Sequence, residues 1–142
     1  MKNNNVYLEH INITVEDIDK SITFFKTAFP EFRVRVDNGE GKDRWVHLGN
    51  DNTYIAIQQN GKTLKRTKDY SRSGINHLGF VVADVKELAN RLLKAGYERS
   101  YPFSKEKFRS RDYFIDNEGY EYEFVQYFSD NIGERNFNDS ID

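Results

Sequence analysis

Two histidines stand at matching places in a repeated sequence pattern. His10 lies in Leu-Glu-His-Ile-Asn-Ile-Thr-Val-Glu-Asp-Ile, and His77 lies in Ile-Asn-His-Leu-Gly-Phe-Val-Val-Ala-Asp-Val, 67 residues later. The same offset pairs Asp17 with Asp84. Imidazole is the commonest metal ligand among side chains. The repeat therefore predicts two copies of one module, each presenting a histidine from its first strand.

A carboxylate on the same surface would complete a metal site, and the last predicted strand offers two. Alternation along residues 120–125 directs Tyr122 and Phe124 toward the core and Glu121 and Glu123 toward the other face. We interpret Glu121 as solvated. Glu123 lies nearer the middle of an aromatic strand, where a charge is costly unless it is paired or bound to metal. Two imidazoles and one carboxylate suit a divalent transition metal.

The elements that position these residues follow the same order in both copies. The first module, about 6–59, is predicted as βαβββ, with strands at 6–15, 32–36, 44–48 and 53–58. Its helix begins after the N-cap Asp17, has apolar residues at helical spacing, and ends at Pro30.

The second module, about 75–128, repeats this order. Strands are predicted at 75–82, 98–100, 109–115 and 120–127, a helix at 85–94, and a turn at 117–119. Residues 60–74 form a basic connection, interpreted as a solvated linker, with a lid over an anionic ligand as the alternative. The polar tail 129–142 is either loosely ordered or packed on a partner subunit.

The composition excludes several classes of protein. The net charge of −2 gives no reason to expect nucleic acid as a partner, and the chain has no cysteine for disulfides or thiolate metal sites. No apolar run approaches the length that spans a membrane. The first residues contain no apolar signal segment, so a cytoplasmic protein is expected.

The segments around His10 and His77, together with Tyr-Phe-Ile-Asp-Asn-Glu-Gly-Tyr-Glu-Tyr-Glu-Phe (113–124), resemble the vicinal oxygen chelate superfamily. This group includes glyoxalase I, extradiol dioxygenases, fosfomycin-resistance transferases, methylmalonyl-CoA epimerase and bleomycin-binding proteins. The resemblance implies one α+β domain over residues 1–142. Its two βαβββ modules would form a curved mixed sheet, or cup, with helices on the convex face. It also implies a homodimer, with the cup built within one chain or across two.

The resemblance further implies one divalent metal per site, Fe, Mn, Ni, Zn or Co, held by His10, His77 and Glu123. Members with four protein ligands take the fourth from the last strand of the first module. The 67-residue offset locates that position at Ala56, which cannot ligate. An octahedral metal would then keep about three open positions for water or for two neighbouring substrate oxygens. This pattern counts against glyoxalase I and the epimerase, and suits transferases and dioxygenases better.

His47 is the remaining histidine. Alternation places Trp45 and His47 opposite Val46 and Leu48, facing the cup, whereas the 67-residue offset pairs His47 with Phe114, a predicted core residue. In the cup, His47 could act as an acid or base. The other interpretation is a partly exposed strand histidine.

Further residues of the two modules are predicted to contact substrate. By position, Tyr113 resembles a substrate-contacting tyrosine of the fosfomycin transferases. Arg109 and Arg111, on the same face, would stabilise an anion, or else be solvated or paired with Glu121 and neighbouring acids. Catalytic roles are predicted for Glu123, Tyr113 and His47, and substrate-binding roles for Arg109, Arg111, Trp45 and Tyr54.

Two classes of function remain open. The first is a metal-dependent enzyme acting on a small molecule that chelates the metal through neighbouring oxygens, as a glyoxalase-like lyase or isomerase, a dioxygenase or a thiol transferase. The fosfomycin-type activity has less support, because the loop after the second helix does not match that group's phosphonate-binding pattern. The second class is a non-enzymatic small-molecule binding protein of the bleomycin-resistance type.

Overall fold

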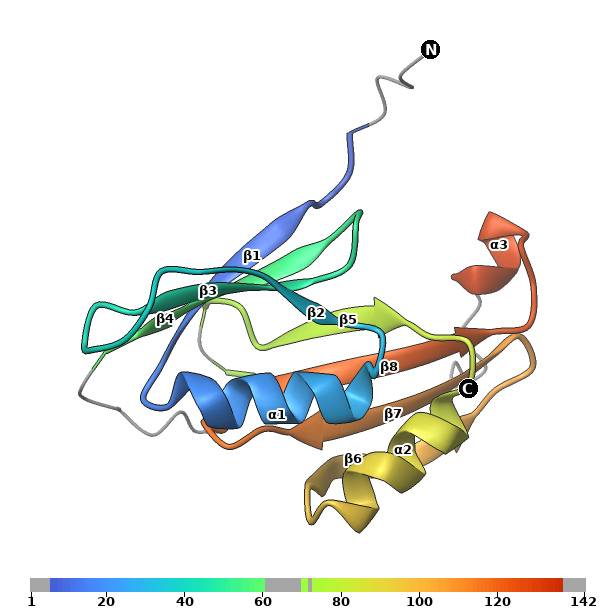
Figure 1. The fold of residues 1–142 in the computed structure, drawn as a ribbon. Coiled ribbons are helices and arrows are strands. Elements are labelled where there is room, and N and C mark those ends of the chain that lie inside the picture. The colour runs from blue at the N-terminus through green and yellow to red at the C-terminus, as the bar shows by residue number, and fades with distance from the viewer. Residues whose placement is uncertain (1–5, 61–69, 72, 137–142) are drawn as a thin grey trace. The chain divides into compact units, whose positions relative to one another are not determined.

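The structure is a computed structural model that describes residues 6–60, 70, 71 and 73–136 (Figure 1). The chain divides into two compact units, Met1–Leu64 and Lys65–Asp142, and each is described by itself. Each unit has the order βαβββ, which confirms the predicted α+β class with two such modules. Within the described part of the chain, the helices are too short and too polar to cross a bilayer.

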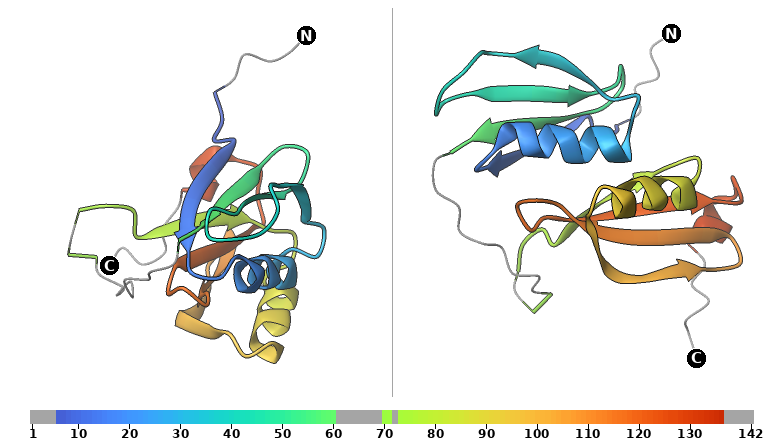
Figure 2. Two further views of the ribbon diagram at one scale, coloured as in Figure 1. Left: turned by 60° about the vertical axis from the view of Figure 1, so that its left-hand side comes forward. Right: turned by 60° about the horizontal axis from the view of Figure 1, so that its bottom comes forward.

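The first unit is a four-stranded mixed sheet covered by one helix. Its elements are β1 (His10–Val15), α1 (Ile18–Ala28), β2 (Arg33–Asp37), β3 (Trp45–Gly49) and β4 (Tyr54–Gln59). The strand order is β1-β4-β3-β2, with β1 parallel to β4 and the other pairs antiparallel. Helix α1 packs on β3 and β4, and Figure 2 shows it along one face of its sheet.

The second unit repeats this arrangement. Its elements are β5 (His77–Val81), α2 (Val85–Lys94), β6 (Glu98–Lys105), β7 (Arg109–Ile115), β8 (Glu121–Tyr127) and the short helix α3 (Ile132–Arg135). The strand order is β5-β8-β7-β6, again with one parallel pair, β5 with β8. Helix α2 packs on β7 and β8.

Both helices begin where the sequence predicts. Asp17 accepts a hydrogen bond from the Lys20 N–H at 3.0 Å, and Asp84 accepts one from the Glu87 N–H at 2.9 Å. These caps satisfy backbone donors that the first turn of a helix leaves without a carbonyl partner. The equivalent caps fix the start of each helix at the same distance after its histidine.

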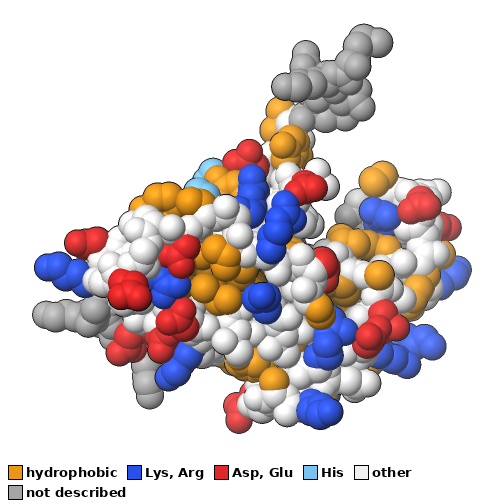
Figure 3. Space-filling view, in the orientation of Figure 1, with side chains coloured by type: hydrophobic (Ala, Val, Ile, Leu, Met, Phe, Trp, Pro, Cys, Tyr) orange, Lys and Arg blue, Asp and Glu red, His pale blue; other side chains and the backbone are white. Residues whose placement is uncertain are grey.

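Apolar side chains between helix and sheet form the core of each unit. In the first unit these include Ile13, Val15, Ile18, Phe24, Phe25, Val46, Leu48, Ile55 and Ile57. In the second they include Val85, Leu88, Ala89, Leu92, Phe114, Tyr122 and Phe124. The other sheet face carries polar and aromatic residues, so both histidines lie on the face that the helix leaves uncovered. On the face shown in Figure 3, side chains of both charge signs are interspersed.

Some predicted boundaries are wrong. The first strand begins at His10, and residues 6–9 before it are exposed. Strand β6 continues to Lys105, well past the predicted end at residue 100, because it stays paired with β7 through two irregularities in register. In the tail, α3 is held by a hydrogen bond from Ser129 to Glu134 and an ion pair between Arg135 and Asp130. Residues 61–69, 72 and 137–142 lie outside the described residues, and with them most of the predicted linker.

Candidate functional site

His77 and Glu123 face one another on adjacent parallel strands of the second unit. The register between β5 and β8 places His77 opposite Glu121 and Gly79 opposite Glu123, so the three polar side chains share one face. His77 Nε2 lies 3.1 Å from Glu123 Oε2. Both side chains are only partly exposed, at 27% and 14%. Glu123 is therefore paired within this unit, as a charge in this part of the strand requires.

Two further residues of β7 surround Glu123. Arg111 Nη1 lies 3.6 Å from Glu123 Oε1, and the Tyr113 hydroxyl hydrogen-bonds the same carboxylate. Burial, and then this hydrogen bond, raise the pKa of Tyr113 to about 12, so the phenol keeps its proton at neutral pH. The Tyr113 ring also meets His77 edge-on, with centroids 5.7 Å apart. These contacts bring four of the predicted site residues together.

Glu121 is not solvated, in contrast to the sequence interpretation. Its relative exposure is 5%, and it accepts a hydrogen bond from the Tyr70 hydroxyl. The same hydroxyl lies 3.4 Å from His77 Nδ1, and Glu121 Oε1 lies 3.9 Å from that nitrogen. Strand alternation placed Glu121 on the correct face, but nothing in the sequence showed that Tyr70, distant along the chain, closes over it.

The two arginines of β7 are paired with an acid that the sequence analysis did not single out. Arg109 Nε donates to Glu106 Oε2 at 2.7 Å, and Arg111 Nη2 contacts the other oxygen. Burial raises the pKa of Glu106, but the hydrogen bond from Arg109 and the charge of Arg111 outweigh it and lower that pKa below its usual value. Glu106, rather than Glu121, is therefore the acid that neutralises Arg109 and Arg111.

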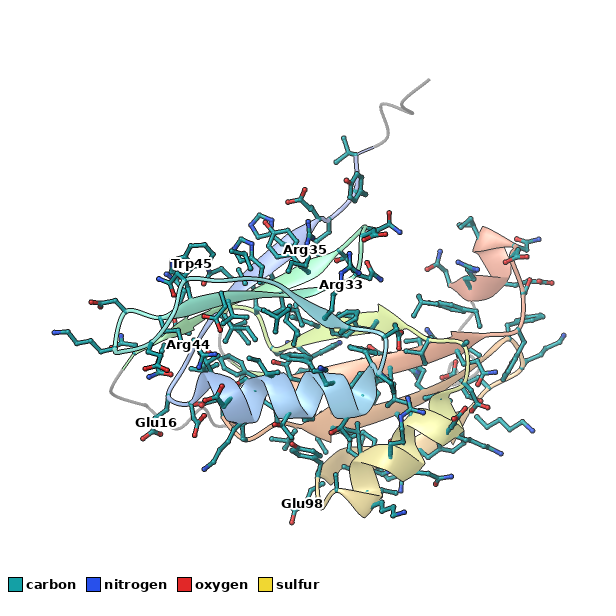
Figure 4. The ribbon with its side chains drawn as sticks, in the orientation of Figure 1. Glu16, Arg33, Arg35, Arg44, Trp45 and Glu98 are labelled. Carbon is teal, nitrogen blue, oxygen red and sulfur yellow. The ribbon has the colours of Figure 1, made fainter. Side chains whose placement is uncertain are left out.

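The equivalent face of the first unit carries stacked rings. The Tyr54 ring stacks on His10 with centroids 4.7 Å apart, and on His47 with centroids 4.5 Å apart. Trp45 lies 5.0 Å from His47, and the Arg35 guanidinium lies 4.5 Å from the Tyr54 centroid. Figure 4 shows Arg35 and Trp45 on the side of this sheet away from α1. This group again unites predicted residues, here without a buried acid.

Each of the two stacked histidines has a distinct environment. His10 Nδ1 lies 3.0 Å from Glu9 Oε1, which lowers the pKa of Glu9. Burial, and then the nearby charge of Arg35, lower the pKa of His47 below its usual value, so this imidazole is neutral at pH 7. A neutral imidazole can accept a proton.

The strand registers settle which residues of the two units are equivalent. Tyr113 pairs with Glu123 across β7 and β8, and His47 pairs with Ala56 across β3 and β4. His47 is therefore the counterpart of Tyr113, and Ala56 that of Glu123. The 67-residue offset shortens by one residue in β3 and β7, which is why it misleadingly matched His47 with Phe114. Alternation was the correct guide.

The donor set bears on whether a metal fits. In the described ranges, no group of three or more His, Asp or Glu side chains is arranged to hold an ion. The pair of His77 and Glu123 is nevertheless compatible with a metal ion. Two ligand atoms that each lie about 2.1 Å from an octahedral metal, at a right angle to one another, are about 3 Å apart. The 3.1 Å between His77 Nε2 and Glu123 Oε2 matches that spacing. His10 belongs to the first unit.

The repeated βαβββ fold, with a histidine on the first strand of each module, defines a class of protein built from paired modules. A family model described as the Glyoxalase/Bleomycin resistance protein/Dioxygenase superfamily matches residues 7–124. The chain belongs to this superfamily. Among curated proteins, no sequence matches the chain.

Solved structures of the same fold agree with this assignment. A glyoxalase family protein from Bacillus cereus superposes with a TM-score of 0.73 at 20% identity, covering 90% of this chain and 98% of that one. The fosfomycin resistance protein FosX from Listeria monocytogenes gives 0.69 at 21% identity, covering 92% and 98%. TioX from Micromonospora sp. gives 0.63 at 16% identity, covering 85% and 95%. At these identities the likeness concerns the fold.

Proposed function

We propose that the protein binds one divalent metal through His77, Glu123 and His10, and that it is an enzyme acting on a small molecule. The observation that carries the proposal is the 3.1 Å approach of His77 Nε2 to Glu123 Oε2, on the face of the second unit's sheet opposite α2. His10 presents the same strand position in the other module. Both imidazoles have a carboxylate near Nδ1, Glu9 for His10 and Glu121 for His77, which leaves Nε2 as the ligating atom.

The substrate class follows from the number of protein ligands. With Ala56 where a fourth ligand would stand, about three positions of an octahedral metal stay open. A substrate with two neighbouring oxygens fills two of them. When bound, the metal polarises these oxygens as a Lewis acid. A dioxygenase, a thiol transferase and a lyase or isomerase are all compatible with this arrangement.

The chain's own residues supply the rest of the chemistry. The Tyr113 hydroxyl, protonated at neutral pH, hydrogen-bonds Glu123, which supports a role as a hydrogen-bond donor to a substrate oxygen. His47, neutral at pH 7, is the proton acceptor of the first unit. Arg109 and Arg111 are already paired with Glu106. The two arginines therefore nearly balance the negative charges of Glu106 and Glu123, and they do not form a free anion site.

Metal analysis of protein purified without chelator tests the proposal, followed by titration of the metal-free protein with Ni(II), Mn(II), Fe(II), Co(II) and Zn(II). The His77→Ala variant should bind at least about 100-fold more weakly, because a directly bound ligand is lost. His47→Ala is the matched histidine control and should leave the metal affinity unchanged. Equal affinities of the wild type and His77→Ala would overturn the proposal.

Turnover assays then separate the activities. Catechols, methylglyoxal–thiol adducts and fosfomycin with a thiol are the three probe substrates, each tested with the metal found. Iron with catechol cleavage would identify a dioxygenase, and nickel or zinc with turnover of the thiol adduct a glyoxalase-like enzyme. Binding of a probe by the metal-free protein with no turnover under any metal would instead identify a sequestering protein.

A further inference from the structure

Arg35 reaches the open face of the first unit's sheet at an irregularity in strand β2. The register with β3 shifts between Val34 and Val36, which leaves Arg35 as one extra residue in the strand. A bulge of this kind changes the direction in which a side chain points. The Arg35 guanidinium lies over the Tyr54 ring, 4.5 Å from its centroid, on the side of the sheet away from α1 (Figure 4).

The positive charge of this exposed guanidinium is not balanced by an acid. Among the residues that the structure describes, no carboxylate forms an ion pair with Arg35. Two acids lie within range of its charge, Glu9 and Asp51. Glu9 already hydrogen-bonds His10, and Asp51 already pairs with Arg33. The Arg35 guanidinium is therefore available to an anion from outside the chain.

Rings beside the guanidinium offer a stacking surface to a flat ligand. The Tyr54 ring stacks on His47 with centroids 4.5 Å apart, and the Trp45 ring lies 5.0 Å from His47. Trp45 and His47 are two residues apart on β3, or about 7 Å along the strand, which is close to the length of a benzene ring with one carboxylate. Val36, the neighbour of Arg35, pairs with His47. A ring laid against Trp45 and His47 would therefore bring an attached carboxylate within reach of Arg35.

We propose that the open face of the first unit binds a small planar aromatic anion, with its ring on Trp45 and His47 and its anionic group on the Arg35 guanidinium. Aromatic contacts and a charge-assisted hydrogen bond each add affinity. The second unit differs here, because Arg111 stands at the position of Trp45 and its charge is paired with Glu106. Identification of this anion with the substrate rests on the proposed function, whereas its binding belongs to the first unit and needs no metal.

The first test titrates the metal-free protein with three probes of similar size, benzoate, benzyl alcohol and cyclohexanecarboxylate. Trp45 is the single tryptophan of the chain, so its fluorescence and the NMR signal of its indole N–H report directly on this face. Benzoate should bind about 10-fold more tightly than either analogue, because benzyl alcohol has no charge and cyclohexanecarboxylate has no flat ring. An affinity for benzoate no higher than that for either analogue would overturn the proposal.

The second test removes the charge. Arg35→Gln should weaken benzoate binding by about 10-fold, to the level of benzyl alcohol, and should leave benzyl alcohol binding unchanged. Arg33→Gln is the matched control, since it removes the same charge two residues away on β2 from an arginine that already pairs with Asp51. At about 0.15 M salt, which screens distant charges, it should change the affinity less than about threefold. Equal losses in the two variants would contradict the assignment to Arg35.

The third test removes the indole ring. Trp45→Leu, followed through the backbone amide signal of Tyr54, should bind benzoate and cyclohexanecarboxylate with equal affinity, because the flat partner of the ring is lost. Circular dichroism verifies that the variant is folded. A folded Trp45→Leu protein that still prefers benzoate by about 10-fold would show that the ring does not stack there, and would overturn the proposed mode of binding.

Metal titration of the same wild-type protein separates this proposal from the proposed function. Selective benzoate binding by a wild type that binds no divalent metal would refute the proposed function and leave the anion site standing. A metal-binding wild type whose Trp45 signals do not respond to benzoate would refute the anion site alone.

Discussion

The two units share a fold but differ in the chemistry of matching positions. Both have the strand order of a βαβββ module, an aspartate N-cap and an apolar core under one helix. On the open sheet face, the second unit has Glu121, Glu123 and Tyr113 where the first has Tyr54, Ala56 and His47. The shared fold is therefore compatible with different chemistry on the open sheet face.

The difference extends into the core of the second unit. Asp112 is fully buried and forms a bidentate ion pair with Arg99, with contacts of 2.8 to 3.0 Å. By strand register, the first unit has Val46 and Val34 at these two positions. Val46 is buried and Val34 is 42% exposed, so one module has an ion pair at this site where the other has two apolar side chains.

The largest expected effect comes from breaking that ion pair. Arg99→Ala should lower the free energy of unfolding by about 3 kcal/mol, because it leaves Asp112 buried without its charge partner. The double variant Arg99→Val with Asp112→Val, which copies the first unit, should recover most of this loss. Urea unfolding followed by circular dichroism measures both, and a double variant no more stable than Arg99→Ala would contradict the comparison.

The next effect concerns the metal. Glu123→Ala, which copies Ala56, should weaken divalent metal binding by about 100-fold, or about 2.7 kcal/mol, because a ligand is removed. Ala56→Glu, the reciprocal change, should strengthen binding by about 10-fold by adding a fourth protein ligand. Isothermal titration calorimetry compares the variants, with circular dichroism to verify folding. Unchanged binding by Glu123→Ala would show that the asymmetry between the units does not concern metal.

A smaller effect, the pH dependence of stability, should distinguish the turn between β7 and β8 from the turn between β3 and β4. Asp116, 6% exposed, accepts from the N–H groups of Glu118 and Tyr120 and from the Tyr122 hydroxyl. Burial raises the pKa of Asp116 to about 6, although these hydrogen bonds act against it. The first unit has the neutral Asn50 at this turn, which accepts from the N–H groups of Asn52 and Thr53.

The pKa of Asp116 in the folded state exceeds the ordinary value of 3.8. The folded state therefore binds more protons than the unfolded state between these two pKa values. The stabilisation that protonated Asp116 gives the folded state is complete below pH 3.8 and is lost as the pH rises through about 6. The wild type should lose about 2 kcal/mol relative to Asp116→Asn between pH 4 and pH 7. Urea unfolding across that range measures the difference, and parallel pH profiles for the two proteins would disprove it.

The smallest effect tests what the units have in common. Asp17→Ala and Asp84→Ala each remove one side-chain acceptor at a helix start and should cost about 1 kcal/mol apiece. Each should lower the Tm by about 3 °C in thermal denaturation followed by circular dichroism. Similar losses would support equivalent helices, whereas a loss confined to one variant would show that the two helices differ in their dependence on the cap.

The sequence predicted the fold well because helices, strands and turns have local signals. The helix at 85–94 and the strand at 109–115 match the structure, since apolar spacing and an N-cap define them. Strand β6 was predicted too short because its polar sequence has no alternation, and its pairing with β7 alone extends it. The alternation that located Glu123 could not reveal that Glu121 is buried, because burial depends on residues distant along the chain.

By itself, the sequence determined the duplicated module, the matching histidines, the face that carries Glu123, and the alanine at the position that matches Glu123. These features follow from periodicity and offset, which are written into the order of residues. Tertiary structure decided that His47 corresponds to Tyr113, that Glu106 neutralises the arginines, and that Tyr70 and Glu121 lie behind His77. Each of these depends on strand register or on a contact across the fold, which only the folded chain specifies.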